Sequence, residues 1–460
     1  MTDTIFERND TLYSLDPEHT RVAKELGAQG VKYAMANWID VLGRPKSKIV
    51  PMTHFADLVA GAERYTPRGF GGIGNMNPTE DEVVGVPDLS TLKILPWDRR
   101  YAWMIADMSY GGREPFALCP RNALRTQVEA AAAQGYSVHL GVEPEFYVFR
   151  PESLDGGHDR LVPVARSGSL KPSPAYDVEA TLDASEFLDT LVGYLGELDF
   201  GVYAFGHEGG DGQYELSIGH APVLEMADRM TLFRFAVKQI AKECGLLATF
   251  MPKPYASMWG SGAHLNMSLV SLETGRNAFR RGDTAGEWTE TTYQFIAGVL
   301  KHAPAFTALG NPTTNSYRRL TPRLADGQIS WAPTRVSYGS NNRSCTVRLP
   351  QNRACIEYRA ADSAANYYFA SALMIAAGLE GIREGLDPGK PLEQASHNSD
   401  APVLPRTLLE AIEAFQSDPL VHKTFSPAFV SEYTEMKLKE WEADHLLVSD
   451  NERRRYLLEL

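Results

Sequence analysis

The segment YSVHLGVEPEFYVF, residues 136–149, carries the clearest periodic pattern in this chain of 460 residues. From position 138 to position 148 every even-numbered residue is apolar, whereas Glu143 and Glu145 occupy odd positions. Successive side chains of a β-strand point to opposite faces, so the pattern predicts a strand with one core face and one acidic face. Two carboxylates on the same face repel each other, and a cation between them would relieve that repulsion.

The same alternation recurs in three later segments, where polar side chains share one face and apolar side chains share the other. Glu208 stands just before a glycine turn, and the alternating polar positions are Glu215, then His264, Asn266 and Ser268, and finally Glu357 and Arg359. Carboxylates with a single histidine form an oxygen-rich ligand set that suits Mg²⁺ or Mn²⁺ better than zinc. We therefore expect four strands to gather acidic side chains around divalent metal.

Arginines provide the complementary charge. Arg319, Arg343 and Arg348 lie in turn-rich or strand-like segments, and each of them alone is typical of a protein surface. Phosphoryl transfer from a nucleotide requires such arginines together with divalent metal, because metal ions bridge phosphate oxygens and guanidinium groups neutralise the charge that develops on the transferred group.

The turn-prone residues 111–115 divide the chain into a short β-rich part and a long α+β part. The pattern predicts strands at 31–39, 47–50, 92–96 and 103–108, and helices at 120–133, 225–244, 364–386 and 431–445. The glycine-rich segment 66–78 lacks the Gly-Lys-Ser/Thr ending of a phosphate-binding loop, which favours a surface loop or a lid.

The composition bears on partners and location. The chain has 58 Asp and Glu against 45 Lys and Arg, a formal net charge of −13, so neither nucleic acid nor an anionic membrane is an expected partner. Four cysteines without metal-site or CxxC spacing, and residues 1–10 without a signal-peptide pattern, favour a cytoplasmic protein. No apolar run reaches the roughly 20 residues that span a bilayer.

With these motifs in view, the chain resembles the glutamine synthetase family over nearly its whole length. The matching segments are 143–146, 207–215, 253–254, 260–264, 315–319, 342–344 with 348–350, and 356–359 with 365–366. The resemblance implies an α+β fold with an N-terminal β-grasp domain, residues 16–112, and a catalytic domain with a curved antiparallel sheet, residues 113–460. It also implies a homo-oligomer, a dodecamer of two hexameric rings, in which neighbouring subunits share each active site.

The same resemblance implies the ligands of metal and nucleotide. One metal would be held by Glu145, Glu208 and Glu215, and the second by Glu143, His264 and Glu357. The phosphates of ATP would bind to Arg343 and Arg348, with Asn266 and Ser268 near the nucleotide. The family's usual histidine is replaced by Asn266 here.

For the other two substrates, the resemblance places glutamate at Gly260, Arg319 and Arg359. Arg319 and Arg343 are also expected to take part in catalysis. Asp40 would reach into the adjacent subunit's site, where it would attract the protonated amine and help to deprotonate it, since only the free base is a nucleophile.

Departures from the family pattern bear on the amine. In glutamine synthetases the arginine of the Asn-Ser-Tyr-x-Arg motif is soon followed by Glu-Ala-Pro, and that glutamate completes the ammonium pocket. Here the stretch 323–333 is longer, and Trp331 stands where the glutamate is expected. We predict that an indole in this place disfavours ammonium and contacts an amine that carries carbon, with Asp326 as a weaker substitute for the carboxylate.

Two further departures concern the glycine turn and its surroundings. The spacing from Glu208 to Glu215 is one residue shorter than in the ammonia-using enzymes, and resembles the branch that makes γ-glutamylmethylamide or γ-glutamylpolyamines. Trp259 precedes Gly260 at a place where glutamine synthetases have an asparagine that contacts glutamate.

The predicted function is an ATP-dependent ligase that joins methylamine or another small alkylamine to the γ-carboxyl of L-glutamate. A γ-glutamyl phosphate would be the intermediate, and ADP and phosphate would be released. The alternatives are a glutamine synthetase that uses ammonium, and a ligase for larger amines such as polyamines or ethanolamine. A non-catalytic, ring-forming relative is disfavoured, because all six metal ligands are present.

Overall fold

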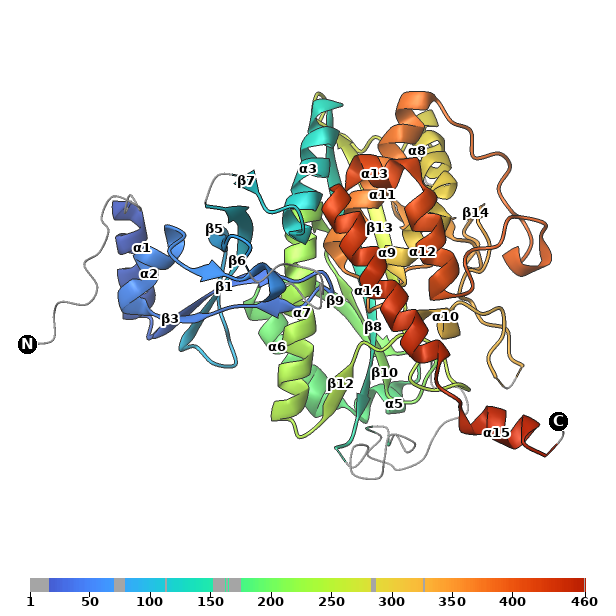
Figure 1. Cartoon of the computed structure of the whole chain (residues 1–460), viewed down its shortest axis with the longest axis horizontal. Coiled ribbons are helices and arrows are strands. Elements are labelled where there is room, and N and C mark those ends of the chain that lie inside the picture. The colour runs from blue at the N-terminus through green and yellow to red at the C-terminus, as the bar shows by residue number, and fades with distance from the viewer. Residues whose placement is uncertain are drawn as a thin grey trace, which may run out of the picture.

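The computed structural model describes residues 16–69, 79–111, 114–151, 162, 164, 175–282, 287–325, 327–458 and 460. Figure 1 shows a sheet near the N-terminus at one end of the molecule and a larger, helix-covered sheet beside it. The predicted α+β class is confirmed. Residues 70–78 of the glycine-rich segment and the expected domain boundary at 112–113 lie outside the described residues, and the boundary stays a prediction.

The N-terminal sheet has the strand order β2-β1-β6-β5-β4, with β3 paired to β1 and β7 paired to β6. Its strands are β1 (Tyr33–Ile39), β2 (Pro45–Lys46), β3 (Ile49–Pro51), β4 (Arg64–Tyr65), β5 (Val83–Ile94), β6 (Tyr101–Tyr110) and β7 (Glu114–Pro115). This strand content is consistent with the expected β-grasp arrangement. The strand expected at 92–96 is the end of the longer β5, which continues across a register shift between Asp88 and Lys93.

Both faces of this sheet are buried. The helices on one face are α1 (Pro17–Ala28) and α2 (Phe55–Val59), and they enclose a small core with Ala34 of β1 and Met104 of β6. On the other face, Trp103 of β6 joins the main core, where its ring stacks on Phe235 with 5.3 Å between the ring centroids. The N-terminal sheet is therefore packed against the rest of the chain.

The larger sheet has the order β14-β15-β16-β13-β8-β10-β9, with β11 and β12 also paired to β8. Its strands are β8 (Tyr136–Phe149), β9 (Val202–His207), β10 (Gln213–Ile218), β11 (Ala221–Pro222), β12 (Leu247–Thr249), β13 (Ala263–Ser271), β14 (Tyr338–Ser340), β15 (Val347–Leu349) and β16 (Ile356–Tyr358). Every described pair in it is antiparallel except β14 with β15.

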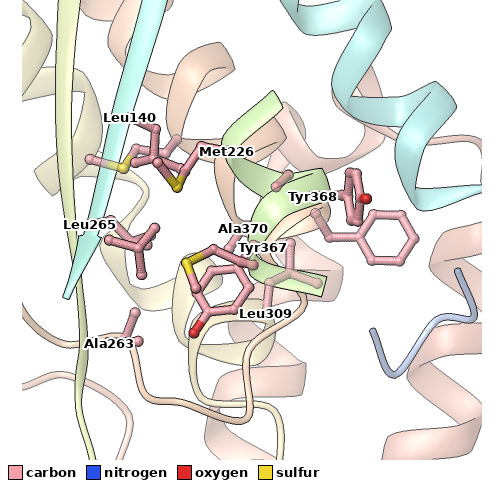
Figure 2. Packing of buried hydrophobic residues seen from close by; sticks show 14 of the residues in the cluster. Leu140, Met226, Ala263, Leu265, Leu309, Tyr367, Tyr368 and Ala370 are labelled. Carbon is pink, nitrogen blue, oxygen red and sulfur yellow. The ribbon is translucent and has the colours of Figure 1, made fainter. Parts of the chain in front are cut away.

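Helices cover one face of the larger sheet and form the main core with it. They are α3 (Pro120–Ala133), α6 (Ser185–Glu197), α7 (Val223–Glu243), α8 (Glu290–Lys301), α9 (Ala303–Gly310), α10 (Ser316–Arg319), α11 (Tyr367–Glu384), α12 (Leu408–Ser417), α13 (Pro419–Thr424) and α14 (Pro427–His445). The short α5 (Val178–Leu182) contributes no residue to this core, and α15 (Asp450–Tyr456) is exposed along its length. Figure 2 shows Leu140 of β8 and Leu265 of β13 facing Met226 of α7 and Tyr367 of α11. The even-numbered side chains of segment 136–149 thus face the core, as their alternation predicted.

Capping residues explain where the predicted helices begin. α3 begins at Pro120, as predicted, because a proline in the first turn lacks only an N–H that would have no partner there. α14 begins before the expected start at 431, because Ser426 caps it and Pro427 follows. None of the described helices is long and apolar enough to cross a membrane.

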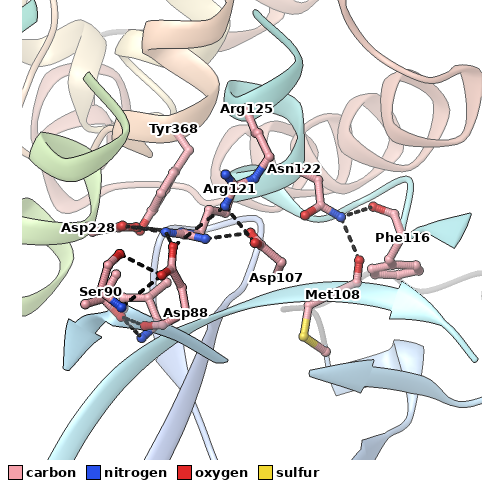
Figure 3. A network of polar contacts seen from close by, with 12 residues as sticks. Asp88, Ser90, Asp107, Met108, Phe116, Arg121, Asn122, Arg125, Asp228 and Tyr368 are labelled. Carbon is pink, nitrogen blue, oxygen red and sulfur yellow. Dashed lines mark hydrogen bonds and ion pairs between the residues drawn. The ribbon is translucent and has the colours of Figure 1, made fainter. Parts of the chain in front are cut away.

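A buried arginine joins the N-terminal sheet to the helices of the larger part of the chain. The guanidinium of Arg121, on α3, is 2.7 Å from Asp107 of β6, 2.8 Å from Asp88 of β5 and 2.9 Å from Asp228 of α7 (Figure 3). Tyr368 of α11 donates a hydrogen bond of 2.6 Å to Asp228. Only 1% of Arg121 is exposed, so its charge depends on these three carboxylates.

We expect Arg121→Met to lower the free energy of unfolding by about 3–5 kcal/mol, because it leaves the buried Asp228 without its cation. Denaturant unfolding at a fixed protein concentration measures this loss. The matched control is Arg125→Met, since Arg125 pairs with the same Asp107 but is partly exposed, and its loss should cost less than about 1 kcal/mol. Equal losses in the two variants would contradict the view that burial makes Arg121 decisive.

Candidate active site

Strand pairing brings most of the predicted metal ligands to one cavity of about 420 Å³. Glu145 of β8 lies directly across the ladder from Glu215 of β10, and Glu143 lies across from His264 of β13. Glu208, at the turn between β9 and β10, lines the same cavity. These five side chains lie on the polar face that the sequence pattern indicated.

The sixth predicted ligand, Glu357 of β16, is fully buried beneath arginines, and Glu143 is compensated in a similar way. Glu357 pairs with Arg348 and Arg359, and Arg353 and His264 lie 3.7 Å and 3.9 Å from its carboxylate. The partners of Glu143 are His264 and Arg353. Burial opposes both negative charges, but these partners outweigh it and hold the pKa of Glu143 and the pKa of Glu357 below the ordinary value of a glutamate. Both carboxylates are therefore ionised at neutral pH.

The carboxylates on the other side of the cavity have less positive charge around them. Glu145 accepts hydrogen bonds from Nε2 of Gln213 at 3.0 Å and from the N–H of Gly262 at 2.9 Å. Burial, followed by the charge of Glu145, raises the pKa of Glu208 to about 8. The same two causes raise the pKa of Glu215 well above its ordinary value. This half of the site would gain most from an added cation.

The donor set in the cavity fits a divalent cation. Carboxylate oxygens of Glu143 and Glu215 and a ring nitrogen of His264 lie within 4.8 Å of one another. Oxygen donors with one imidazole suit Mg²⁺ or Mn²⁺. A cation among them would also offset the repulsion by Glu145 that, after burial, raises the pKa of Glu208. Because this trio draws on both predicted ligand sets, the division of the six residues between two metals stays a prediction.

The three residues expected to bind glutamate lie beside the acidic cluster. Arg319, at the end of α10, is buried, and its guanidinium donates to the carbonyl of Ala360 at 2.8 Å and to that of Arg359 at 3.2 Å. A Cβ on Gly260 would lie 2.7 Å from Cγ of Arg319, and one on Gly262 would lie 2.7 Å from its Nη2. The absence of side chains at both glycines therefore lets Arg319 reach the cavity.

An aromatic pair borders the cavity on the side of the flap, the segment that follows α10. A β-bridge between Arg323 and Ile329 closes this flap on itself. Trp331 follows it, is 50% exposed, and meets Trp259 edge to face, with 5.6 Å between ring centroids and 82° between ring planes. Both indoles line the cavity. Asp326, the alternative carboxylate of the flap, lies outside the described residues.

The residues expected to bind ATP line two adjoining cavities. Asn266 and Ser268 of β13 line a second cavity of about 400 Å³. The predicted phosphate arginines, Arg343 and Arg348, line the first cavity. Arg353 lines both, so a ligand that extends from one cavity to the other would pass its guanidinium.

Asp40 lies at the turn after β1 and is fully buried. Its carboxylate accepts hydrogen bonds from the N–H of Leu42 at 3.0 Å and from that of Arg44 at 2.8 Å, and it pairs with the Arg44 guanidinium at 2.8 Å. Within a single chain this carboxylate therefore stabilises its own turn. Its expected role at the amine of an adjacent subunit stays a prediction.

Among the polar residues of the cavity that sequence reasoning missed, two contact the acidic cluster directly. Arg353 lies in the turn between β15 and β16, where no alternation marks it. Gln213 begins β10 and holds Glu145, and a signal was available, because it stands two positions before Glu215 and therefore shares its face.

Comparisons with known proteins agree with this geometry. Residues 117–456 match the family model described as the glutamine synthetase catalytic domain. A glutamine synthetase from Rhizobium leguminosarum bv. phaseoli is 35% identical over 90% of this chain and 94% of its own length. A glutamate–methylamine ligase from Methyloversatilis universalis is 35% identical over 93% of this chain and 96% of its own length. A solved structure of GmaS with ADP has a TM-score of 0.87 and 32% identity, covering 96% of this chain and all of that one.

The raised pKa values predict how pH and metal act on stability. A glutamate whose pKa is raised by folding binds its proton more tightly in the folded state, so without metal the melting temperature should fall as pH rises from about 5 to 8. Metal binding displaces these protons, so the increase in melting temperature caused by Mg²⁺ or Mn²⁺ should be larger at pH 8 than at pH 6.

Differential scanning fluorimetry with and without metal measures both effects. The matched variant is Glu208→Gln, which should weaken the fall with pH and reduce the gain from metal. A gain from metal that is independent of pH, or unchanged in Glu208→Gln, would contradict this account of the acidic cluster.

Proposed function

The chain belongs to the glutamine synthetase family, and from this premise we propose that it joins methylamine, or another small alkylamine, to the γ-carboxyl of L-glutamate. Its general activity is that of an ATP-dependent carbon–nitrogen ligase. The proposal specifies the amine, the γ-glutamyl phosphate intermediate, and ADP and phosphate as products.

The observation that carries the proposal is the aromatic border of the cavity. Trp331 presents an indole at the place where the resemblance leads one to expect a carboxylate, and Trp259 meets it edge to face. An indole offers no second anion for ammonium, but its apolar surface contacts an alkyl group favourably. A glutamate–methylamine ligase among the relatives, and GmaS among the solved structures, are in line with this choice.

Two other amines have specific support. Ammonium is supported by the glutamine synthetase that is 35% identical to this chain. Larger amines are supported by a third cavity of about 590 Å³, because Trp331 lines both that cavity and the first one. We rank both below methylamine, since neither explains why the indole of Trp331 at the end of the flap contacts the indole of Trp259.

In the proposed reaction the divalent metals, held by Glu143, Glu145, Glu208, Glu215, His264 and Glu357, would supply the positive charge that phosphoryl transfer requires. Arg343 and Arg348 would bind the phosphates of ATP, whose base would lie by Asn266 and Ser268. Arg348 already compensates Glu357, so one guanidinium would link the nucleotide to the acidic cluster.

Arg319, Arg359 and Gly260 would hold glutamate with its γ-carboxylate toward the transferred phosphate. The attack by the amine requires a free base, so a nearby carboxylate must attract the alkylammonium ion and accept its proton. We propose Asp40 of an adjacent subunit for this step. That role requires Asp40 to exchange its hydrogen bonds to Leu42 and Arg44 for the amine.

We also propose the assembly that the family resemblance implies, a dodecamer of two hexameric rings, and a cytoplasmic location. Exposed apolar side chains near the C-terminus support self-association: they are Leu446, Leu447, Val448, Leu457, Leu458 and Leu460. Exposed apolar side chains that follow one another so closely along the chain are common at contact surfaces.

The amine is identified by phosphate release with ATP, Mg²⁺ and glutamate, measured against ammonium, methylamine, ethylamine, ethanolamine and putrescine. We expect kcat/KM for methylamine or ethylamine to exceed that for ammonium by at least about tenfold, as a well-placed alkyl contact allows. A higher kcat/KM for ammonium would contradict the proposed substrate, and a higher value for putrescine would favour the ligase for larger amines.

The role of the flap is tested by Trp331→Glu, which restores a carboxylate. We expect the ratio of kcat/KM for ammonium to that for methylamine to rise about tenfold, because a second anion favours the small cation and the alkyl contact is lost. Trp331→Phe is the matched control and should keep the preference for methylamine. Equal losses with both amines in Trp331→Glu would contradict this role.

A further inference from the structure

We infer that Trp259 determines the preference for a short alkylammonium ion, because its rigidly held indole forms the second wall of the amine pocket. This inference rests on the proposed function and extends it to a residue outside the flap. The family resemblance marks this position only as one near glutamate, so the assignment to the amine comes from the contacts of the indole.

The backbone around Trp259 is held by three buried side chains. Lys253 donates to the carbonyl of Met258, Tyr147 donates to that of Trp259 at 2.5 Å, and Nε2 of Gln213 donates to that of Gly260 at 3.3 Å. Three successive carbonyls are thus bound to side chains from other segments. Such tethering fixes the direction in which the indole leaves the backbone.

The indole itself rests on a glycine. A Cβ on Gly209 would lie 2.6 Å from Cδ1 of Trp259, so any other residue at 209 would displace the ring. Gly210 has a matching role, since its Cβ would lie 1.8 Å from the Tyr147 hydroxyl that tethers Trp259. The glycine turn is therefore shaped to receive this indole.

Glu208 immediately precedes Gly209, on which the indole of Trp259 rests, so the side chains of Glu208 and Trp259 lie at the same turn. Both line the 420 Å³ cavity together with Trp331. Two facing indoles suit a cation that carries a small apolar group, because the aromatic faces attract the charge while the rings contact the alkyl carbon. Ammonium would use only part of this surface.

The test is steady-state kinetics of Trp259→Leu and Trp259→Phe with ATP, Mg²⁺ and glutamate, varying one substrate at a time. We expect Trp259→Leu to raise the KM for methylamine about tenfold, within the range of a lost alkyl contact, and Trp259→Phe to raise it less. The KM for ammonium and the KM for glutamate should change by less than about twofold. Melting temperatures of both variants establish that they fold.

The matched control is Trp441→Leu, because Trp441 lies on α14, stacks on His445 and does not line the cavity. A rise in the KM for glutamate rather than methylamine in Trp259→Leu would overturn the inference and assign Trp259 to the amino acid. A KM for methylamine in Trp259→Leu that is as little changed as in Trp441→Leu would also overturn it. In both cases a wild-type preference for methylamine would leave the proposed function intact, whereas a wild-type preference for ammonium would contradict the two together.

Discussion

Repulsion between carboxylates confined to one cavity is the constraint on which the rest of the site depends. The sheet places Glu143, Glu145 and Glu215 on adjacent strands, and its rigid core on the opposite face prevents them from moving apart. Arginines offset this repulsion at Glu143 and Glu357. At Glu208 and Glu215 it persists, and burial together with this repulsion raises their pKa values. Without divalent metal, these close carboxylates therefore destabilise the fold.

Alternation along single strands could be predicted from the sequence, whereas contacts between strands could not. The odd positions of 136–149 placed Glu143 and Glu145 on one face, and the structure confirms that face. Which residue stands opposite each glutamate depends on strand order and register, so the pairing of Glu145 with Glu215 was not readable. The role of Arg353 could not be predicted for a similar reason, since only the fold brings its turn close to Glu143.

The family resemblance predicted more of the site residues than the residue patterns did. It assigns a role to a position in the sequence, but it does not describe the contacts of that residue in the fold. It pointed to Trp331 and Trp259 as departures, and the structure adds that the two rings meet and line one cavity. It pointed to Asp40 as a group that acts across subunits, and the structure adds that this carboxylate already holds its own turn. Whether a side chain is already bound by its own chain depends on its neighbours in the fold, and a sequence motif does not include them.

The buried Arg121, which joins the N-terminal sheet to helices α3 and α7, has a consequence for how this chain can diverge or be engineered. Asp88 and Asp107 come from the N-terminal sheet, whereas Arg121 and Asp228 come from helices beyond it. A chimera that takes its first hundred or so residues from a relative must bring both aspartates with it. Otherwise Arg121 keeps only Asp228, and the two ion pairs that connect the N-terminal sheet to α3 are lost.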